Sequence, residues 1–361
     1  MRLILTILLW LSAPAWAQQE TDSPIRITQM ASGFDEPWAI GFLPDNALLV
    51  TERAGALWSV TPGGARFRVR GVPAVAARGQ GGLLDILVPR DFATSREVFL
   101  TFSKSQGWGS GTALAVGRLS EDRRWLRDVR LLFELTPGST GSRHFGSRLV
   151  EAADGRLFMT IGERGDRPAA QDLSRENGSV IRINRDGSVP ADNPFINTQG
   201  AQPEIWSFGH RNPQGAALDL QGNLWINEHG ARGGDEVNRV RKGANYGWPV
   251  ISYGVHYSGA KIGEGTAKPG MQQPAFYWDP SIAPSGLMIY SGRLWPQWRG
   301  DFFIGSLKFD MISRLDGDTM QEVARIKTPQ TGRVRDIREG PSGAIWFLSV
   351  DDGALYRMTP G

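Results

Sequence analysis

The chain has 361 residues, including 45 glycines, 22 prolines, 13 tryptophans and no cysteine, and this length suffices to bury a large core without disulfide bonds. The formal net charge is +3, from 40 lysines and arginines against 37 aspartates and glutamates, and no basic run appears. This balance argues against nucleic acid as a partner. Many glycines and tryptophans are typical of short strands joined by tight turns, so we expect an all-β protein.

The first 17 residues have the pattern of a secretory signal peptide. Arg2 supplies a positive start, residues 3–11 are almost entirely apolar, and Ala15 and Ala17 are the small residues of a cleavage site. We predict cleavage after Ala17 and a mature protein that is periplasmic or secreted. The apolar stretch is too short to span a bilayer, so an uncleaved signal anchor is the less favoured alternative. No later segment has the length or hydrophobicity of a membrane span, so we do not expect a membrane-embedded protein.

Along residues 18–361 one pattern recurs: an apolar strand, a polar turn with Asp or Gly, a second apolar strand and a polar break. Two strands around a tight turn form a hairpin, the unit of an antiparallel sheet. Four clear copies and then two looser ones occur, in residues 39–50, 147–159, 216–226, 334–347, 84–102 and 287–304.

A further strand follows most copies, so the chain is predicted to contain six units of about four strands each, the signature of a β-propeller. We predict that residues 18–361 form a single six-bladed β-propeller with four-stranded antiparallel blades, closed into a ring by residues 25–27. Stacked sandwiches are the weaker alternative. Long breaks such as residues 243–274 are expected to be loops on one face, so the active site is predicted in loops at one end of the central channel.

The chain has only four histidines, and a neutral histidine is a natural base for removing a proton from a hydroxyl group. His144 lies just before the inner strand of a predicted blade, where its side chain is expected to face the channel. His210 stands at the matching place of the next blade. One such histidine alone is more often structural, but two polar clusters at equivalent positions favour a shared site.

A glycine-rich acidic stretch covers residues 228–236. Backbone carbonyls and carboxylates are the oxygen ligands that Ca²⁺ prefers, although the spacing is not that of an EF-hand. An ordinary acidic turn explains this stretch equally well.

Three cations follow late in the chain. Lys308 comes after an apolar strand, and Arg333 and Arg335 flank Val334, so strand alternation would place both arginines on one face. Guanidinium groups suit carboxylates and phosphates, but a solvated charged face is the alternative.

Several cofactor classes find no support in the sequence. No histidine pair has zinc spacing, there is no cysteine, and no phosphate-binding loop occurs. A nicotinamide fingerprint needs a strand, a glycine-rich turn and a helix, and the chain shows little helical periodicity. A redox cofactor, if present, is therefore not expected to be NAD.

The chain resembles the soluble sugar dehydrogenases that depend on pyrroloquinoline quinone (PQQ), the glucose/sorbosone dehydrogenase family. The resemblance covers nearly the whole mature chain, and the order of its motifs along the blades makes it specific. The motifs occupy residues 79–85, 144–149, 209–215, 235–249, 283–285 and 333–336.

This resemblance implies a six-bladed propeller that uses PQQ and Ca²⁺ to oxidise aldose sugars to lactones. His144 corresponds to the base that removes the proton of the anomeric hydroxyl group, and Arg211 to a residue that contacts the cofactor and stabilises negative charge on its carbonyl. Gln80 corresponds to a substrate contact. The resemblance assigns cofactor binding to Arg211, Asn212, Tyr257, Lys308, Arg333 and Arg335.

Calcium sites are also implied by the resemblance. The carbonyls of Gly230 and Ala231 correspond to ligands of the ion that polarises the quinone, and Glu236 and Tyr246 to ligands of a second, structural ion. The implied partners are an aldose substrate and an external electron acceptor, and we expect a monomer.

Three positions depart from the family pattern. Arg143 stands where glucose-specific members have an acid, Ala231 replaces a proline, and Glu163 replaces a shorter Asp. Arg143 in particular argues for broad aldose oxidation. Two alternatives from other classes remain: a calcium-dependent propeller lactonase, which would need acidic ligands on the channel axis, and a binding propeller without catalysis.

Overall fold

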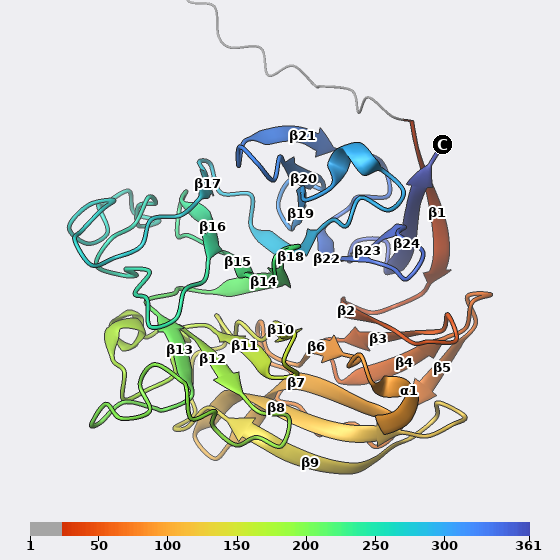
Figure 1. Cartoon of the computed structure of the whole chain (residues 1–361), viewed down its shortest axis with the longest axis horizontal. Coiled ribbons are helices and arrows are strands. Elements are labelled where there is room, and N and C mark those ends of the chain that lie inside the picture. Colours follow the sequence, from red (N-terminus) through yellow and green to blue (C-terminus); the bar gives the residue numbers. More distant parts are fainter. Residues whose placement is uncertain (1–23) are drawn as a thin grey trace, which may run out of the picture.

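The computed structural model describes residues 24–361, and the predicted signal peptide lies outside this range. Six four-stranded antiparallel sheets are arranged around a centre, with the innermost strands gathered in the middle of the molecule (Figure 1). The predicted six-bladed β-propeller is therefore confirmed.

Blades 1 to 3 follow one another along the chain, each running from an inner to an outer strand. Their strands are β2 Pro37–Phe42, β3 Leu48–Glu52, β4 Ala56–Val60 and β5 Arg66–Val69; β6 Leu83–Leu87, β7 Glu97–Gln106, β8 Gly109–Leu119 and β9 Leu126–Glu134; and β10 Leu149–Glu151, β11 Leu157–Ile161, β12 Ser179–Ile183 and β13 Ile205–Phe208.

Blades 4 to 6 repeat this order, and only short helical turns interrupt the strands. The strands are β14 Pro213–Leu218, β15 Leu224–Glu228, β16 Asp235–Arg239 and β17 Phe276–Trp278; β18 Pro284–Ile289, β19 Phe302–Ser306, β20 Ile312–Leu315 and β21 Glu322–Ile326; and β22 Val334–Glu339, β23 Ile345–Ser349 and β24 Ala354–Pro360, with β1 Ile25–Ser32. The helical turns are α1 Phe92–Ser95, η1 Arg167–Gln171 and η2 Pro296–Trp298.

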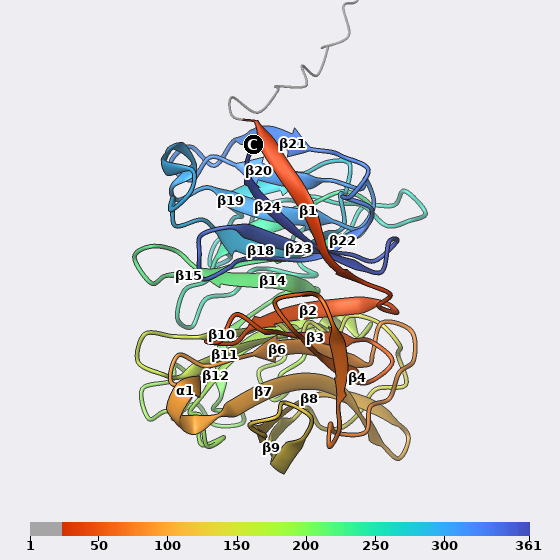
Figure 2. The same ribbon diagram turned by 90° about the vertical axis from the view of Figure 1, so that its right-hand side faces the viewer.

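The ring is closed by the first strand of the chain. β1 pairs antiparallel with β24, with Arg26 opposite Thr359, and so completes the last sheet (Figure 2). The prediction that residues 25–27 join the last blade is confirmed. The two ends of the described chain are held together by backbone hydrogen bonds, and β1 becomes the outer strand that covers the edge of β24.

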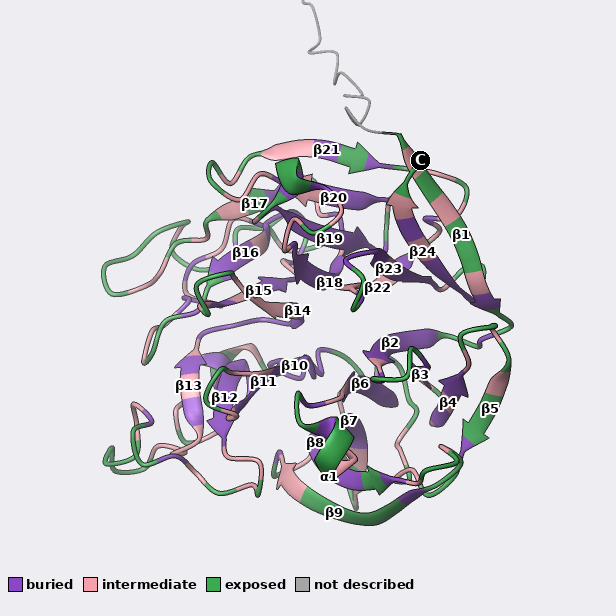
Figure 3. Ribbon diagram, turned by 45° about the vertical axis from the view of Figure 1, so that its right-hand side comes forward, coloured by how far each residue is buried: buried purple, intermediate pink, exposed green. Residues whose placement is uncertain are grey.

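The middle strands are buried on both faces because each blade packs against two neighbours. β3, β11 and β19 are buried throughout, whereas β5 and β9 at the rim are largely exposed (Figure 3). This packing explains why the middle strands have continuous apolar sequences. One apolar cluster joins blades 1 and 2, with Leu49, Leu57, Leu83 and Ile86 among its fully buried members.

The predicted polar turns join the inner strand to the second strand. In blades 3 and 4 the turn positions Gly155 and Gly222 both have φ of 83°, a conformation that glycine adopts at little cost. The repeat in the sequence therefore corresponds to a repeated backbone geometry.

An ionic network ties inner strands together across the channel. Arg148, just before β10, contacts Asp85 on β6 at 3.1 Å and Asp336 on β22 at 2.8 Å. Arg338 pairs with the same two aspartates. Both aspartates are almost fully buried, so blades 2, 3 and 6 are joined by paired charges. Within residues 24–361, no helix has the length and apolar character needed to cross a membrane.

Candidate active site

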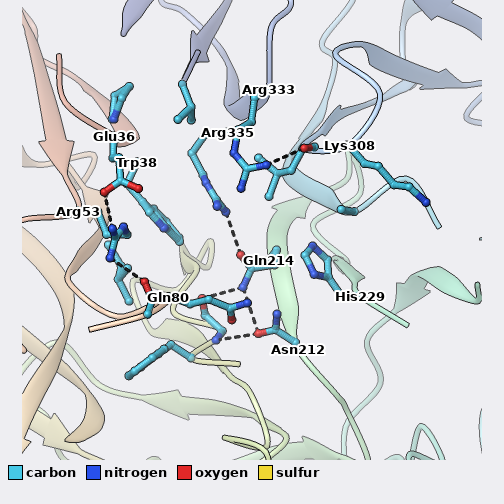
Figure 4. A pocket seen from close by; sticks show the side chains of 18 residues that line it. Glu36, Trp38, Arg53, Gln80, Asn212, Gln214, His229, Lys308, Arg333 and Arg335 are labelled. Atoms are coloured by element: carbon cyan, nitrogen blue, oxygen red, sulfur yellow. Dashed lines mark hydrogen bonds and ion pairs between the residues drawn. The ribbon is translucent and has the colours of Figure 1, made fainter. Parts of the chain in front are cut away.

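A cavity of about 550 Å³ opens at one end of the channel, formed by residues at or near the ends of inner strands and of the strands beside them (Figure 4). Every blade contributes to its wall, so it lies on the propeller axis, as the sequence predicts. The lining residues are Glu36, Pro37, Trp38, Arg53, Gly79, Gln80, Leu84, Phe145, Gly146, Asn212, Gln214, His229, Ala283, Leu307, Lys308, Arg333, Arg335 and Val350.

Three cations line one side of this cavity. Arg335 Nη1 donates to Gln214 Oε1 at 3.0 Å, and Arg333 Nη1 donates to the Leu307 carbonyl at 2.8 Å. Within the described chain, none of Lys308, Arg333 and Arg335 has a carboxylate at ion-pair distance. In Figure 4 the ammonium group of Lys308 extends away from the two guanidinium groups, and it lies 4.9 Å from the ring centre of Phe309.

The argument that placed both arginines on one strand face was wrong. β22 begins at Val334, so Arg333 precedes it, with φ of 44°, and the register of β22 shifts between Val334 and Asp336. A left-handed residue followed by a bulge replaces simple alternation. Both guanidinium groups nevertheless reach the same cavity.

Burial acts strongly on Arg335. Loss of solvent lowers its pKa to about 9, and the neighbouring charges of Arg333 and Arg148 add to this effect. A buried cation without an anionic partner is costly, so this cavity is complementary to a ligand that carries negative charge.

His144 lies in the loop before β10, five residues ahead of the strand start at Leu149. Its φ is 56°, a strained value for a residue other than glycine, which is common at functional sites. The backbone N–H of His144 donates to Gln80 Oε1 at 2.7 Å, which joins the loop to the cavity wall.

The imidazole ring of His144 is oriented by Glu163. Nδ1 lies 2.8 Å from Glu163 Oε1, and both side chains are nearly buried. Burial lowers the pKa of His144 below 6.5, opposed by Glu163 and assisted by the positive charge of Arg211. The ring is therefore neutral near pH 7. A carboxylate at Nδ1 holds the proton there and leaves Nε2 as a proton acceptor.

Arg211 lies between His144 and the loop that follows β15. Its Nη1 donates to the His229 carbonyl at 3.2 Å, its carbonyl accepts from Glu163 N at 2.9 Å, and its buried Nε has no partner. Asn212, the next residue, accepts through Oδ1 from Gln214 Nε2 at 3.2 Å and lines the main cavity. The structure thus brings Gln80, His144, Arg211 and Asn212 together.

The proposed metal residues lie beside a second, small space of about 20 Å³, which is large enough for one water molecule or ion. Gly230 and Glu236 line it, together with Glu228 and Tyr246. Ala231 is buried in the same loop. No cluster of three or more His, Asp or Glu side chains suited to a metal occurs within residues 24–361, so any ion here would depend on backbone oxygens as well.

Glu228 and Glu236 are direct neighbours across β15 and β16. Burial and the charge of Glu228 raise the pKa of Glu236 to about 8. Asn238 Nδ2 bridges the two carboxylates at 3.1 Å each. Two like charges in a buried place are stabilised by a cation, so this oxygen-rich donor set fits a hard divalent ion.

The roles of Tyr246, Tyr257 and His210 in the site are less direct than the sequence predicts. The Tyr246 hydroxyl donates to the Arg239 carbonyl, which leaves the backbone carbonyl of Tyr246 as its available metal ligand. Tyr257 is 74% exposed and lies outside the main cavity. His210 is fully buried, with Nδ1 at 2.9 Å from Glu228 Oε1, and neither His210 nor His144 is among the residues that line the main cavity.

Sequence reasoning missed several lining residues, among them Trp38, Gln214 and His229. Trp38 follows Pro37 at the start of β2, and Gln214 follows Pro213 at the start of β14. A proline at the start of the inner strand is the signal that could have located both. His229 donates from Nε2 to the Pro284 carbonyl at 2.8 Å, and burial lowers its pKa to about 3, so it is neutral.

Comparisons with known proteins agree with this geometry. The glucose/sorbosone dehydrogenase family matches residues 34–357. The aldose sugar dehydrogenase YliI of Escherichia coli K12 is 43% identical over 98% of this chain and 97% of its own length. The crystal structure of the soluble aldose sugar dehydrogenase of Escherichia coli, in its apo form, superposes with a TM-score of 0.90 at 42% identity, over 94% of this chain and 100% of that one. The PQQ-bound aldose sugar dehydrogenase of Streptomyces coelicolor shares the fold, with a TM-score of 0.77 at 24% identity, over 93% and 98% of the two chains.

The fold and the cation-lined cavity at the channel end define a propeller oxidoreductase that acts on sugars. The chain belongs to the glucose/sorbosone dehydrogenase family, as the motifs indicate, and it is a sugar dehydrogenase.

Proposed function

We propose that the protein oxidises aldose sugars at the anomeric carbon to lactones, with PQQ and Ca²⁺ as cofactors and His144 as the general base. The observation that carries this proposal is the set of arginines without carboxylate partners in the channel cavity, next to a neutral histidine oriented by a carboxylate. The aldose specificity of the Escherichia coli relative supports the substrate class.

The donor set fits PQQ because this cofactor has three carboxylates. Arg333, Arg335 and Lys308 would hold these groups, with Asn212 as a further polar contact. The carbonyls of Gly230 and Ala231 would hold the calcium ion beside the quinone, and the small space near Glu236 and Tyr246 would hold a second, structural ion. When bound, PQQ would supply a quinone that accepts two electrons, and a calcium ion next to it would polarise the quinone as a Lewis acid.

The residues of this chain supply proton transfer and orientation. Nε2 of His144 accepts the proton of the anomeric hydroxyl group, and Glu163 stabilises the resulting imidazolium. Gln80 fixes the loop through the His144 backbone and presents its amide to the substrate. Arg211 places a positive charge beside the reacting centre, where negative charge develops.

The test is reconstitution of the purified protein. PQQ, CaCl₂, an aldose and an electron-accepting dye should together give dye reduction, and omission of any one should abolish it. EDTA should remove the activity, and Ca²⁺ should restore it better than Mg²⁺, which prefers a tighter octahedral site. A protein that binds PQQ and Ca²⁺ yet reduces no dye with any aldose would contradict the proposal. Such a result would favour the lactonase or the binding propeller.

The proposal also covers the location of the protein and the acceptor of its electrons. The N-terminal pattern supports a periplasmic or secreted protein that begins at Gln18 and passes its electrons to an external acceptor. Cell fractionation and N-terminal sequencing of the mature protein would test this, and an intact N-terminus on cytoplasmic protein would contradict it.

A further inference from the structure

We propose that an open pocket beside His144 and Glu163 binds an acidic substituent of the sugar, so that the enzyme prefers aldoses with a carboxylate or phosphate group over neutral aldoses. This inference rests on the proposed function and adds a substrate class to it. The observation behind it is an exposed arginine, Arg143, that the proposed cofactor site does not use.

The pocket has a volume of about 570 Å³ and two walls, both of which continue directly into the catalytic pair. Arg143 precedes His144 in one wall, and Arg164 follows Glu163 in the other. A molecule in the pocket therefore lies against the residues that flank both members of the pair. The lining residues are Ser139, Thr140, Gly141, Ser142, Arg143, Arg164, Gly165 and Asp166.

One exposed arginine gives this pocket its accessible positive charge. Arg143 is exposed and lies against Gly165, where a β-carbon would be 3.1 Å from its Nε. Arg164 is only 1% exposed, and its terminal nitrogens donate to the carbonyls of Arg143 and Gly141, so it supports the pocket wall. Within residues 24–361, neither guanidinium group has a carboxylate at ion-pair distance.

The nearby carboxylates are already engaged. Glu163 contacts His144 through Oε1 and accepts from Gly165 N through Oε2. Asp166, which lines the pocket, pairs with Arg175 at 2.8 Å. The charge that the pocket presents to a ligand is thus the positive charge of Arg143, and the hydroxyls of Thr140 and Ser142 add hydrogen-bond donors. This set suits a carboxylate or phosphate on a sugar.

The pocket is separate from the proposed cofactor site. Gln80, which lines the main cavity, accepts from His144 N and donates its own N–H to the Ser142 carbonyl at 2.8 Å. The segment 142–144 is therefore a wall between the two spaces. A sugar whose anomeric hydroxyl group lies at His144 has its terminal carbon one ring away, within reach of a neighbouring subsite. An acid at that carbon would meet Arg143.

The experiment compares kcat/KM for glucuronate with glucose, galacturonate with galactose, and glucose 6-phosphate with glucose, in the reconstituted enzyme. We expect a preference for the acidic sugars that decreases at high ionic strength. Arg143→Gln should lower kcat/KM for the acids relative to the neutral sugars by about tenfold, as expected for one charge-assisted hydrogen bond. Arg143→Lys keeps the positive charge and should retain part of the preference for acidic sugars. Comparison of the two uronates with glucose 6-phosphate shows whether the enzyme prefers a carboxylate or a phosphate group.

The control is Arg68→Gln, which removes the same charge from an exposed position on β5 and should leave the ratio unchanged. Calorimetric titration of glucuronate and glucose into the protein without cofactor gives a second readout that needs no turnover, and Arg143→Gln should weaken glucuronate selectively. Equal kcat/KM for acidic and neutral sugars, unchanged by Arg143→Gln, would overturn this inference while leaving aldose oxidation intact. Failure of neutral and acidic sugars alike to reduce the dye would instead count against the proposed function, and the calorimetric comparison would still decide the subsite.

Discussion

The channel contains two groups of arginines with opposite surroundings. Arg148 and Arg338 share Asp85 and Asp336, whereas Arg335 and Arg333 at the cavity have only neutral partners, Gln214 and the Leu307 carbonyl. One strand contributes to both groups, since Arg335 and Arg338 both belong to β22. The distinction therefore comes from the carboxylates that each side chain meets, and not from the element that carries it.

The pKa values reflect this difference. The two aspartates raise the pKa of Arg338 in spite of burial, while burial without such partners lowers the pKa of Arg335 to about 9. Paired charges hold blades together, but a buried cation without an anion destabilises the protein until a ligand supplies one. The comparison teaches that the positive charges available to a ligand are those that the fold leaves without carboxylates.

The largest expected effect is on catalysis at the cavity end. His144→Ala should lower dye reduction by about 10²–10⁴-fold, the usual contribution of a general base. Because His144 is not among the cationic residues that would bind PQQ, titration of the variant with PQQ should follow the wild-type curve. Turnover like that of the wild type would exclude His144 as the base, and loss of PQQ binding would show that the substitution disturbed the cavity instead.

The free energy of unfolding should decrease when Arg148 and Arg338 lose one of their carboxylate partners. Asp336→Ala leaves Arg148 and Arg338 with one shared carboxylate in a buried place, and it also removes the acceptor of Ile40 N at 2.9 Å. Loss of one partner of a buried pair costs about 3–5 kcal/mol. Urea unfolding followed by fluorescence measures this change. The control Asp318→Ala removes an exposed aspartate and should change the free energy of unfolding by less than about 0.5 kcal/mol. Equal effects of the two substitutions would show that the network contributes little.

The affinity for PQQ should decrease when Arg335, which has no carboxylate partner, is replaced. Arg335→Ala should weaken PQQ binding about tenfold or more, since a hydrogen bond to a charged group contributes about 1.5–3 kcal/mol. It should not lower the free energy of unfolding of the cofactor-free protein, because it removes a buried cation without a carboxylate. Recovered dye reduction during PQQ titration, at saturating sugar, gives the affinity. A curve that superposes on the wild type would remove Arg335 from the cofactor site.

Blade number and ring closure could be predicted from the sequence because they depend on local repetition, and the turn geometry at Gly155 recurs at Gly222. Lys308, Arg333 and Arg335 are assigned to the cavity through the family resemblance, since their charge pattern alone is equally consistent with a solvated face. His229 and the pocket beside Arg143 could not be predicted, because each is defined by segments that meet only in the closed ring. The backbone conformation at Arg333 could not be predicted either, because the alternation of apolar and polar residues does not reveal a left-handed residue or a bulge.

The smallest expected effect is a shift in the pH profile, and it tests the role of Glu163. Burial lowers the pKa of His144 below 6.5, and only neutral imidazole accepts a proton, so kcat/KM should stay constant down to a pH below 6.5 and fall as His144 becomes protonated. Glu163 opposes this lowering, because its negative charge favours the imidazolium. Glu163→Gln therefore removes a contribution that raises the pKa, and the acidic limb should move to lower pH by about one unit. In Glu163→Gln the maximal kcat/KM at higher pH should fall as well, because the amide orients the ring less strongly. Glu163→Asp keeps the carboxylate, so its kcat/KM should fall at the same acidic pH as in the wild type. A limb that moves to higher pH in Glu163→Gln would show that Glu163 does not act through the charge of His144.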